Sequence, residues 1–132
     1  MHHLVYTSSA NAPLTEEYLH EHLEQWRATN ARLGVTGVLL YSEDNVLQVL
    51  EGEAETIHSL FASIANDVRH RSVTKIADGP VPGRAFSEWS MRFRTVELAD
   101  YNRFMQQVRG GPSHASSLAL LLESFMAAGP LE

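Results

Sequence analysis

The chain has 132 residues, of which 44% are hydrophobic and 20% charged, as in a single globular domain with its own core. Ten basic residues against sixteen acidic ones give a net charge of −6, which argues against binding to nucleic acid or anionic membranes. The sequence contains no cysteine, so disulfides, thiolate catalysis and cysteine-based zinc sites are excluded.

The first third of the chain predicts two strands with a helix between them. Residues 3–9 (HLVYTSS) alternate in polarity and precede ANAP, which is typical of a strand followed by a turn. Thr15 can cap a helix, and apolar side chains then recur at helical spacing as far as Gly34. This stripe consists of Leu19, Leu23, Trp26, Asn30 and Leu33. Residues 35–42 (VTGVLLYS) predict the second strand.

A hairpin and a second helix come next. The residues EDN predict a turn, and 46–51 predict a third strand that pairs with the second. Apolar side chains then share one face of a helix. They are Ile57, Leu60, Phe61, Ile64, Ala65 and Val68.

The last third predicts two more strands and two helices. Residues 72–81 (SVTKIADGPV) predict a fourth strand, which Gly79 and Pro80 are expected to interrupt. Residues 86–96 (FSEWSMRFRTV) predict a fifth strand. Two helices are expected around 98–108 and 116–126, with RGGPS between them.

This order of elements predicts an α+β, ferredoxin-like βαββαβ fold with an added fifth strand and a C-terminal helical pair. The sheet should be mainly antiparallel, with the first and third strands at its centre and both early helices on one face. We expect residues 1–95 to form the domain and residues 96–132 to be a helical extension of the same globular unit.

Three polar residues lie on faces that should point inward: Tyr6, Asn30 and Gln48. Since a buried polar group without a partner costs about 1–3 kcal/mol, each must bond to another, to water or to a ligand. The fold order allows all three to converge between the helices and the sheet. From the pattern alone, however, three separately satisfied side chains are the more frequent arrangement.

Five blocks of the sequence together resemble the BLUF domain, a blue-light sensor that uses flavin. In the family's order and spacing, they are LVYTSS, ATNARLGVTGVLLYS, VLQVLEGE, IANDVRH and RAFSEWSMRF, and they cover about residues 3–95. Single blocks are weak signals, whereas five that include the Tyr, Asn, Gln and Trp-x-Met positions are specific. One departure is Val46, which stands where the family often carries Phe.

The resemblance implies a photoreceptor, not an enzyme, that binds flavin non-covalently. Tyr6 would be the electron and proton donor, and Gln48 would bridge Tyr6 and the flavin. Asn30 would hydrogen-bond the polar edge of the ring. Trp89 and Met91 match the strand-five pair of the family, one of which would lie beside Gln48, and Met91 is also expected to contact the flavin.

The resemblance also implies which residues hold the rest of the cofactor. Arg69 and His70, with Arg32 as a further candidate, would contact its ribityl or phosphate part. FAD is the expected cofactor, and FMN is the alternative. Under blue light, a rotated or tautomerised Gln48 would present a different hydrogen bond to the flavin and shift its absorbance to the red. The fifth strand would pass this change to the C-terminal helices.

We expect the signal to reach a separate, unknown effector protein, because the chain shows no added output domain. The C-terminal helices could also join two copies into a homodimer. No nucleic-acid or membrane partner is expected, and the absence of an apolar signal region favours a cytoplasmic location. No metal site is expected either, because no two of the seven histidines have H-x-x-x-H spacing.

Three other functions compete with a photoreceptor. A hydrolase of the acylphosphatase type would need an arginine and a glycine-rich loop after the first strand, and TSSANAP supplies neither. An RNA-binding sheet would need exposed aromatic side chains and a basic face. A flavin-free interaction module would be distinguished from the sensor by its absorbance spectrum.

Overall fold

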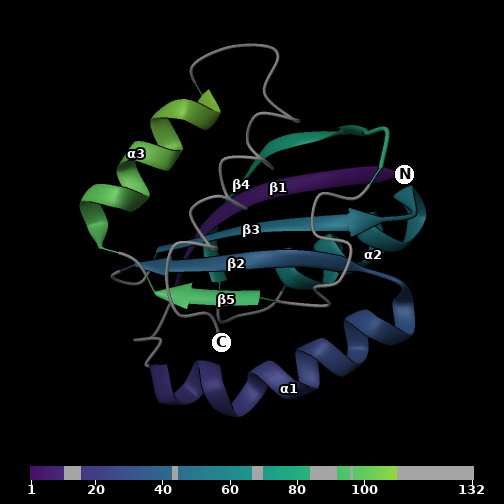
Figure 1. The fold of residues 1–132 in the computed structure, drawn as a ribbon, viewed down its shortest axis with the longest axis horizontal. Helices are drawn as coiled ribbons and strands as arrows, with labels where there is room; N and C mark the ends of the chain where they lie inside the picture. Colours follow the sequence, from purple (N-terminus) through teal and green to yellow (C-terminus); the bar gives the residue numbers. More distant parts are fainter. Residues whose placement is uncertain (11–15, 43–44, 67–69, 84–91, 96, 110–132) are drawn as a thin grey trace.

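The structure is a computed structural model that describes residues 1–10, 16–42, 45–66, 70–83, 92–95 and 97–109. Its centre is a five-stranded sheet with the order β4-β1-β3-β2-β5 (Figure 1). The strands are β1 (His2–Ala10), β2 (Thr36–Ser42), β3 (Asn45–Gly52), β4 (His70–Pro80) and β5 (Arg92–Thr95). The helices are α1 (Glu16–Leu33), α2 (Ala54–Ala65) and α3 (Leu98–Arg109).

The arrangement of the first four strands confirms the predicted ferredoxin-like α+β fold. β1 pairs with β3 and β4, β3 also pairs with β2, and all three pairings are antiparallel. β1 and β3 therefore lie inside the sheet. β5 is a short edge strand parallel to β2. The earlier part of the predicted fifth strand and the predicted helix at 116–126 lie outside the described residues.

The course of β4 differs from the sequence-based prediction. Gly79 and Pro80 do not interrupt the strand, because they pair with His3 and His2 of β1. Pro80 ends a strand at the edge of the sheet, where a missing N–H costs little. The irregularities lie earlier, where the pairing register of β1 and β4 shifts twice and Ser72 has a φ of 52°.

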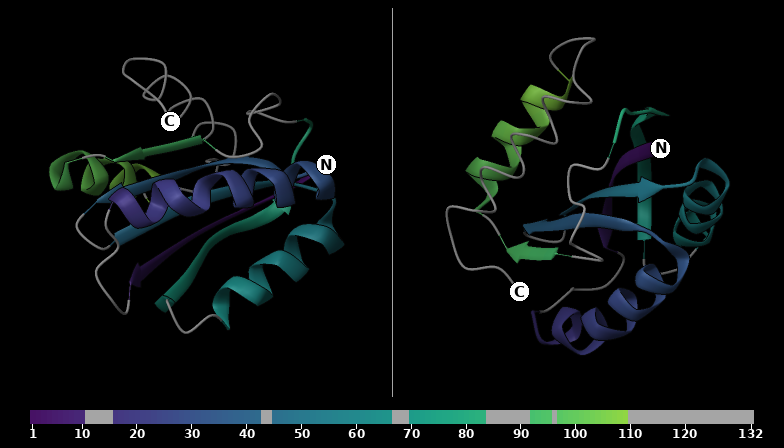
Figure 2. Two further views of the ribbon diagram at one scale, coloured as in Figure 1. Left: turned by 90° about the horizontal axis from the view of Figure 1, so that it is seen from below. Right: turned by 45° about the vertical axis from the view of Figure 1, so that its right-hand side comes forward.

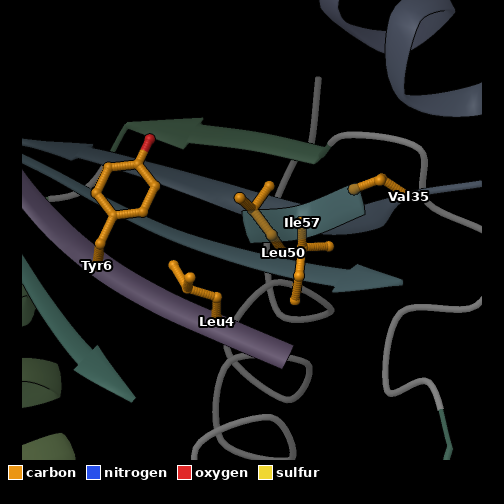
Figure 3. Packing of buried hydrophobic residues seen from close by; sticks show 5 residues of the cluster. All are labelled: Leu4, Tyr6, Val35, Leu50 and Ile57. Carbon is orange, nitrogen blue, oxygen red and sulfur yellow. The ribbon is translucent and has the colours of Figure 1, made fainter. Parts of the chain in front are cut away.

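A hydrophobic core fills the space between the sheet and α2, which packs against β1, β3 and β4. Because β1 and β3 pair even residue with even residue, their even-numbered side chains lie on one face of the sheet. This face carries the core. Figure 3 shows the buried cluster, which consists of Leu4, Tyr6, Val35, Leu50 and Ile57. The predicted apolar face of α2 covers it with Leu60, Phe61 and Ile64.

The central strands are buried on their other face as well. The odd-numbered residues Val5, Leu47 and Val49 are as inaccessible as the core cluster, with exposed fractions of at most 1%. In the right-hand view of Figure 2, the strands lie between α3 on one side and α1 and α2 on the other. Within the described part of the chain, none of the helices has the length and apolar character needed to cross a membrane.

Gly37 of β2 lies so close to the backbone of β3 that no side chain fits there. A Cβ atom on Gly37 would lie 1.9 Å from the carbonyl oxygen of Val49. Because this neighbour is backbone inside the sheet, relief requires β2 and β3 to move apart. We therefore expect Gly37→Ala to lower the free energy of unfolding by about 3 kcal/mol or more, measured by urea denaturation.

Gly79→Ala is the matched control for this prediction. A Cβ at Gly79 would meet nothing within 4 Å. Its effect on the free energy of unfolding should stay within about 0.5 kcal/mol. Equal stability of the two variants would show that the close approach of Gly37 to Val49 does not exclude a side chain at position 37.

Candidate functional site

Tyr6 and Gln48 face each other across the two interior strands. They are direct partners in the register of β1 and β3, so both side chains point to the same face of the sheet. Both are buried, with exposed fractions of 1% and 5%. The Tyr6 hydroxyl donates a hydrogen bond to Gln48 Oε1. The structure thus joins two of the three inward polar residues.

Burial controls the protonation of this pair. Desolvation raises the pKa of the Tyr6 phenol well above its usual value of about 10, so Tyr6 keeps its proton in alkaline as well as neutral solution. The bond directs the oxygen of the Gln48 amide toward Tyr6, and a primary amide also has a donor group at Nε2. The pair therefore combines a protonated phenol with a group that can accept or donate.

Phe61 of α2 packs against the Tyr6 ring. The two ring centroids are 5.4 Å apart, and the planes are inclined at 56°. Tilted aromatic pairs of this kind contribute about 0.5–1.5 kcal/mol beyond the area they bury. On the sequence, Phe61 was one member of an apolar stripe, so its role in fixing the tyrosine ring emerges only from the structure.

Asn30 is held inward by the C-terminal turn of α1. It is 3% exposed, and its backbone carbonyl accepts a hydrogen bond of 2.8 Å from the N–H of Val35. Gly34 ends the helix with a φ of 71°, a conformation that suits glycine at this position. The local helix ending therefore sets the position of Asn30, whereas the sheet sets those of Tyr6 and Gln48.

Of the other predicted site residues, one is exposed, one is described by its backbone alone, and three lie outside the described residues. Arg32 is exposed in the last turn of α1. The backbone of His70 begins β4 opposite Ala10, and its side chain is not among those described. The remaining three predicted positions lie outside the described residues. They are Arg69, Trp89 and Met91.

One contact near the site was not anticipated from the sequence. Tyr101 of α3 is buried, and its hydroxyl donates a hydrogen bond of 3.2 Å to the backbone carbonyl of Val46. Val46 is two residues from Gln48 on the same strand. The only sequence signal was an aromatic side chain in a predicted helix, which does not reveal its partner. α3 is thus attached to the strand that carries Gln48.

Comparison with known proteins places these residues in a family context. A family model described as "BLUF: Sensors of blue-light using FAD" matches residues 1–92. The photoactivated adenylate cyclase subunit alpha of Euglena gracilis is 38% identical over 91 residues, which are 67% of this chain and 9% of that protein. The chain therefore corresponds to a small part of this relative.

Among the solved structures that resemble this chain, two match it over nearly its full length. The dark state of BlrB, a BLUF protein, has a TM-score of 0.72 at 27% identity, and the match covers 97% of this chain and 96% of that one. Klebsiella pneumoniae BlrP1 with FMN and cyclic diGMP has a TM-score of 0.68 at 27% identity, over 96% of this chain and 34% of that one.

Proposed function

The chain belongs to the BLUF family of blue-light sensors that use FAD, and we propose that the buried pair of Tyr6 and Gln48 forms its light-responsive site. The single observation that carries this proposal is the hydrogen bond between a protonated phenol and an amide inside the sheet. Neither group is needed to hold an ordinary apolar core, and both can change their hydrogen bonds without any change of the fold.

The donors and acceptors of this site fit the polar edge of a flavin ring. A bound flavin supplies the absorption of blue light. Gln48 and Asn30 would hold its ring, because each amide offers both a donor and an acceptor. Arg69, His70 and Arg32 would serve the ribityl or phosphate end. We propose FAD as the cofactor, since the family is described by it, and keep FMN as the alternative that BlrP1 contains.

The Gln48 side chain can switch between two hydrogen-bonding arrangements. In the first, its Oε1 accepts a hydrogen bond from the Tyr6 hydroxyl. Rotation of the amide would turn Nε2 toward Tyr6 and Oε1 away, and a change of tautomer would likewise exchange a donor for an acceptor. Since the pair is buried, water does not compete for either arrangement. Each arrangement therefore presents a different group to the ring.

We propose that the signal leaves through the sheet toward a separate effector protein. The Euglena relative is named as an adenylate cyclase subunit, and BlrP1 was solved with cyclic diGMP, so related domains occur in proteins linked to cyclic nucleotides. In this chain, Trp89 and Met91 are the proposed receivers of the change at Gln48. The bond between Tyr101 and Val46 supports a second route through α3.

Absorbance spectra before and after blue light test the proposed function. The purified protein should be yellow, and illumination should shift its flavin band to the red, with full recovery in the dark. Free flavin under the same light is the control. It has no protein side chains around it and should therefore show no reversible shift. A colourless protein would support a flavin-free interaction module, and a bound flavin without a shift would refute the switch.

A further inference from the structure

Two histidines and one carboxylate, from β1, α2 and β4, lie close together. Figure 1 shows the start of β1, marked N, beside α2 and the end of β4. Nε2 of His2 and Nε2 of His58 both contact Oδ1 of Asp78, and the His58 contact is 2.8 Å long. The three candidate ligand atoms all lie within 4.8 Å of one another. The cluster lies apart from the pair of Tyr6 and Gln48, and it has no part in the function proposed above.

We propose that His2, His58 and Asp78 bind a divalent transition metal ion, with Zn²⁺ as the occupant. Imidazole nitrogen and carboxylate oxygen are ligands that zinc accepts at about 2.0–2.2 Å. Ligand atoms around a tetrahedral ion then lie about 3.3 Å apart. All three candidate ligand atoms lie within 4.8 Å of one another, so small side-chain movements can bring them to this separation. Two imidazoles favour zinc over magnesium or calcium, which prefer oxygen ligands.

The two imidazole rings of the cluster lie next to each other. Their planes are inclined at 75°, and their centroids are 5.0 Å apart, so the rings meet edge to face. The side chains of His2, His58 and Asp78 are 17%, 46% and 20% exposed, which leaves a path from solvent. Because the ligands come from two paired strands and a helix, the fold itself brings them together. Three protein ligands leave a fourth position for water.

Lys75 would oppose the ion and thereby set its affinity. Its Nζ lies 2.8 Å from Oδ2 of Asp78. Both histidines contact Oδ1, and His58 Nε2 also lies 3.1 Å from Oδ2. The lysine side chain is 45% exposed, so its ammonium group can move into solvent when an ion enters. Without a metal, Lys75 is a cation beside the carboxylate. A neutral side chain at this position should therefore strengthen metal binding.

Titration of zinc chloride into the tag-free, flavin-loaded full chain, followed by calorimetry, tests this proposal. We expect one ion per chain. His58→Gln and Asp78→Asn should each weaken binding by at least about tenfold, the lower end of what loss of an outer-shell partner costs. Lys75→Met should strengthen binding about fivefold. His22→Gln, the same change on α1 outside the cluster, should bind as the wild type does.

Cobalt absorbance gives a second measurement that does not depend on heat. Co²⁺ bound by the two histidines should produce visible bands at wavelengths longer than those of flavin. Zinc should displace the Co²⁺ and remove these bands. The bands should be weakened or lost in His58→Gln and unchanged in His22→Gln. Absence of saturable zinc binding by the wild type would overturn the proposal and leave an ordinary surface cluster of ion pairs. If His58→Gln and His22→Gln lost the same amount of metal binding, the metal would be bound elsewhere, and this result too would overturn the proposal.

Discussion

Gln48→Leu is expected to bind flavin and remain yellow, yet show no red shift under blue light. Leucine has a similar volume and suits a buried position in β3, so the fold should persist. It offers no donor or acceptor, and the Tyr6 hydroxyl loses the partner that the structure gives it. The unpaired hydroxyl should cost about 1–3 kcal/mol of stability. The measurement is the light-minus-dark spectrum at matched flavin content.

Gln106→Leu is the matched control for this experiment. Gln106 is exposed on α3, so the same chemical change is made away from the site. It should leave the amplitude and the dark recovery of the red shift unchanged. A full shift in Gln48→Leu would exclude Gln48 as the switch. A reduced shift in both variants would point to a general effect on the protein.

Tyr6→Phe is also expected to abolish the red shift, because it removes the donor of the same hydrogen bond. Phenylalanine keeps the ring that packs on Phe61 but removes the hydroxyl that donates to Gln48. Tyr101→Phe is the control, because it also removes one buried hydroxyl, yet this hydroxyl bonds to a backbone carbonyl. That variant should retain a reversible shift. A normal photocycle in Tyr6→Phe would remove Tyr6 from the mechanism.

The pH dependence of stability gives Tyr6→Phe a second readout. Burial raises the pKa of Tyr6 in the folded state, whereas in the unfolded state it stays near its ordinary value of about 10. Above about pH 10 the unfolded chain releases a proton that the folded chain retains, so stability falls as pH rises. This contribution is absent in Tyr6→Phe. Urea denaturation at pH 8 and above 10 should therefore show a smaller loss in the variant than in the wild type.

Alternation along single strands was enough to predict the face of the sheet on which Tyr6 and Gln48 lie. Fold order then placed their strands side by side, because a βαββαβ chain puts β1 and β3 in the centre. The bond itself depends on register, since a shift of one residue would turn one of the two side chains to the other face. The sequence does not state that register.

The cluster of His2, His58 and Asp78 shows the limit of reading spacings along the chain. A search for histidines one helical turn apart finds nothing, because these ligands come from β1, α2 and β4. They become neighbours only when β4 pairs with β1 and α2 packs across both. The contact between Tyr101 and Val46 could not be predicted for the same reason, because the two residues are 55 positions apart in the sequence.

If Tyr6 and Gln48 form the proposed switch, their position on interior strands bears on how often it rearranges in darkness. Both strands are hydrogen-bonded along both edges, so spontaneous local opening must break two ladders at once. Thermal fluctuation of the backbone then seldom separates the pair. A pair on an edge strand or a loop would rearrange more often without light. On the proposed function, this position inside the sheet should lower the rate of switching in darkness, so that absorption of light is the main cause of switching.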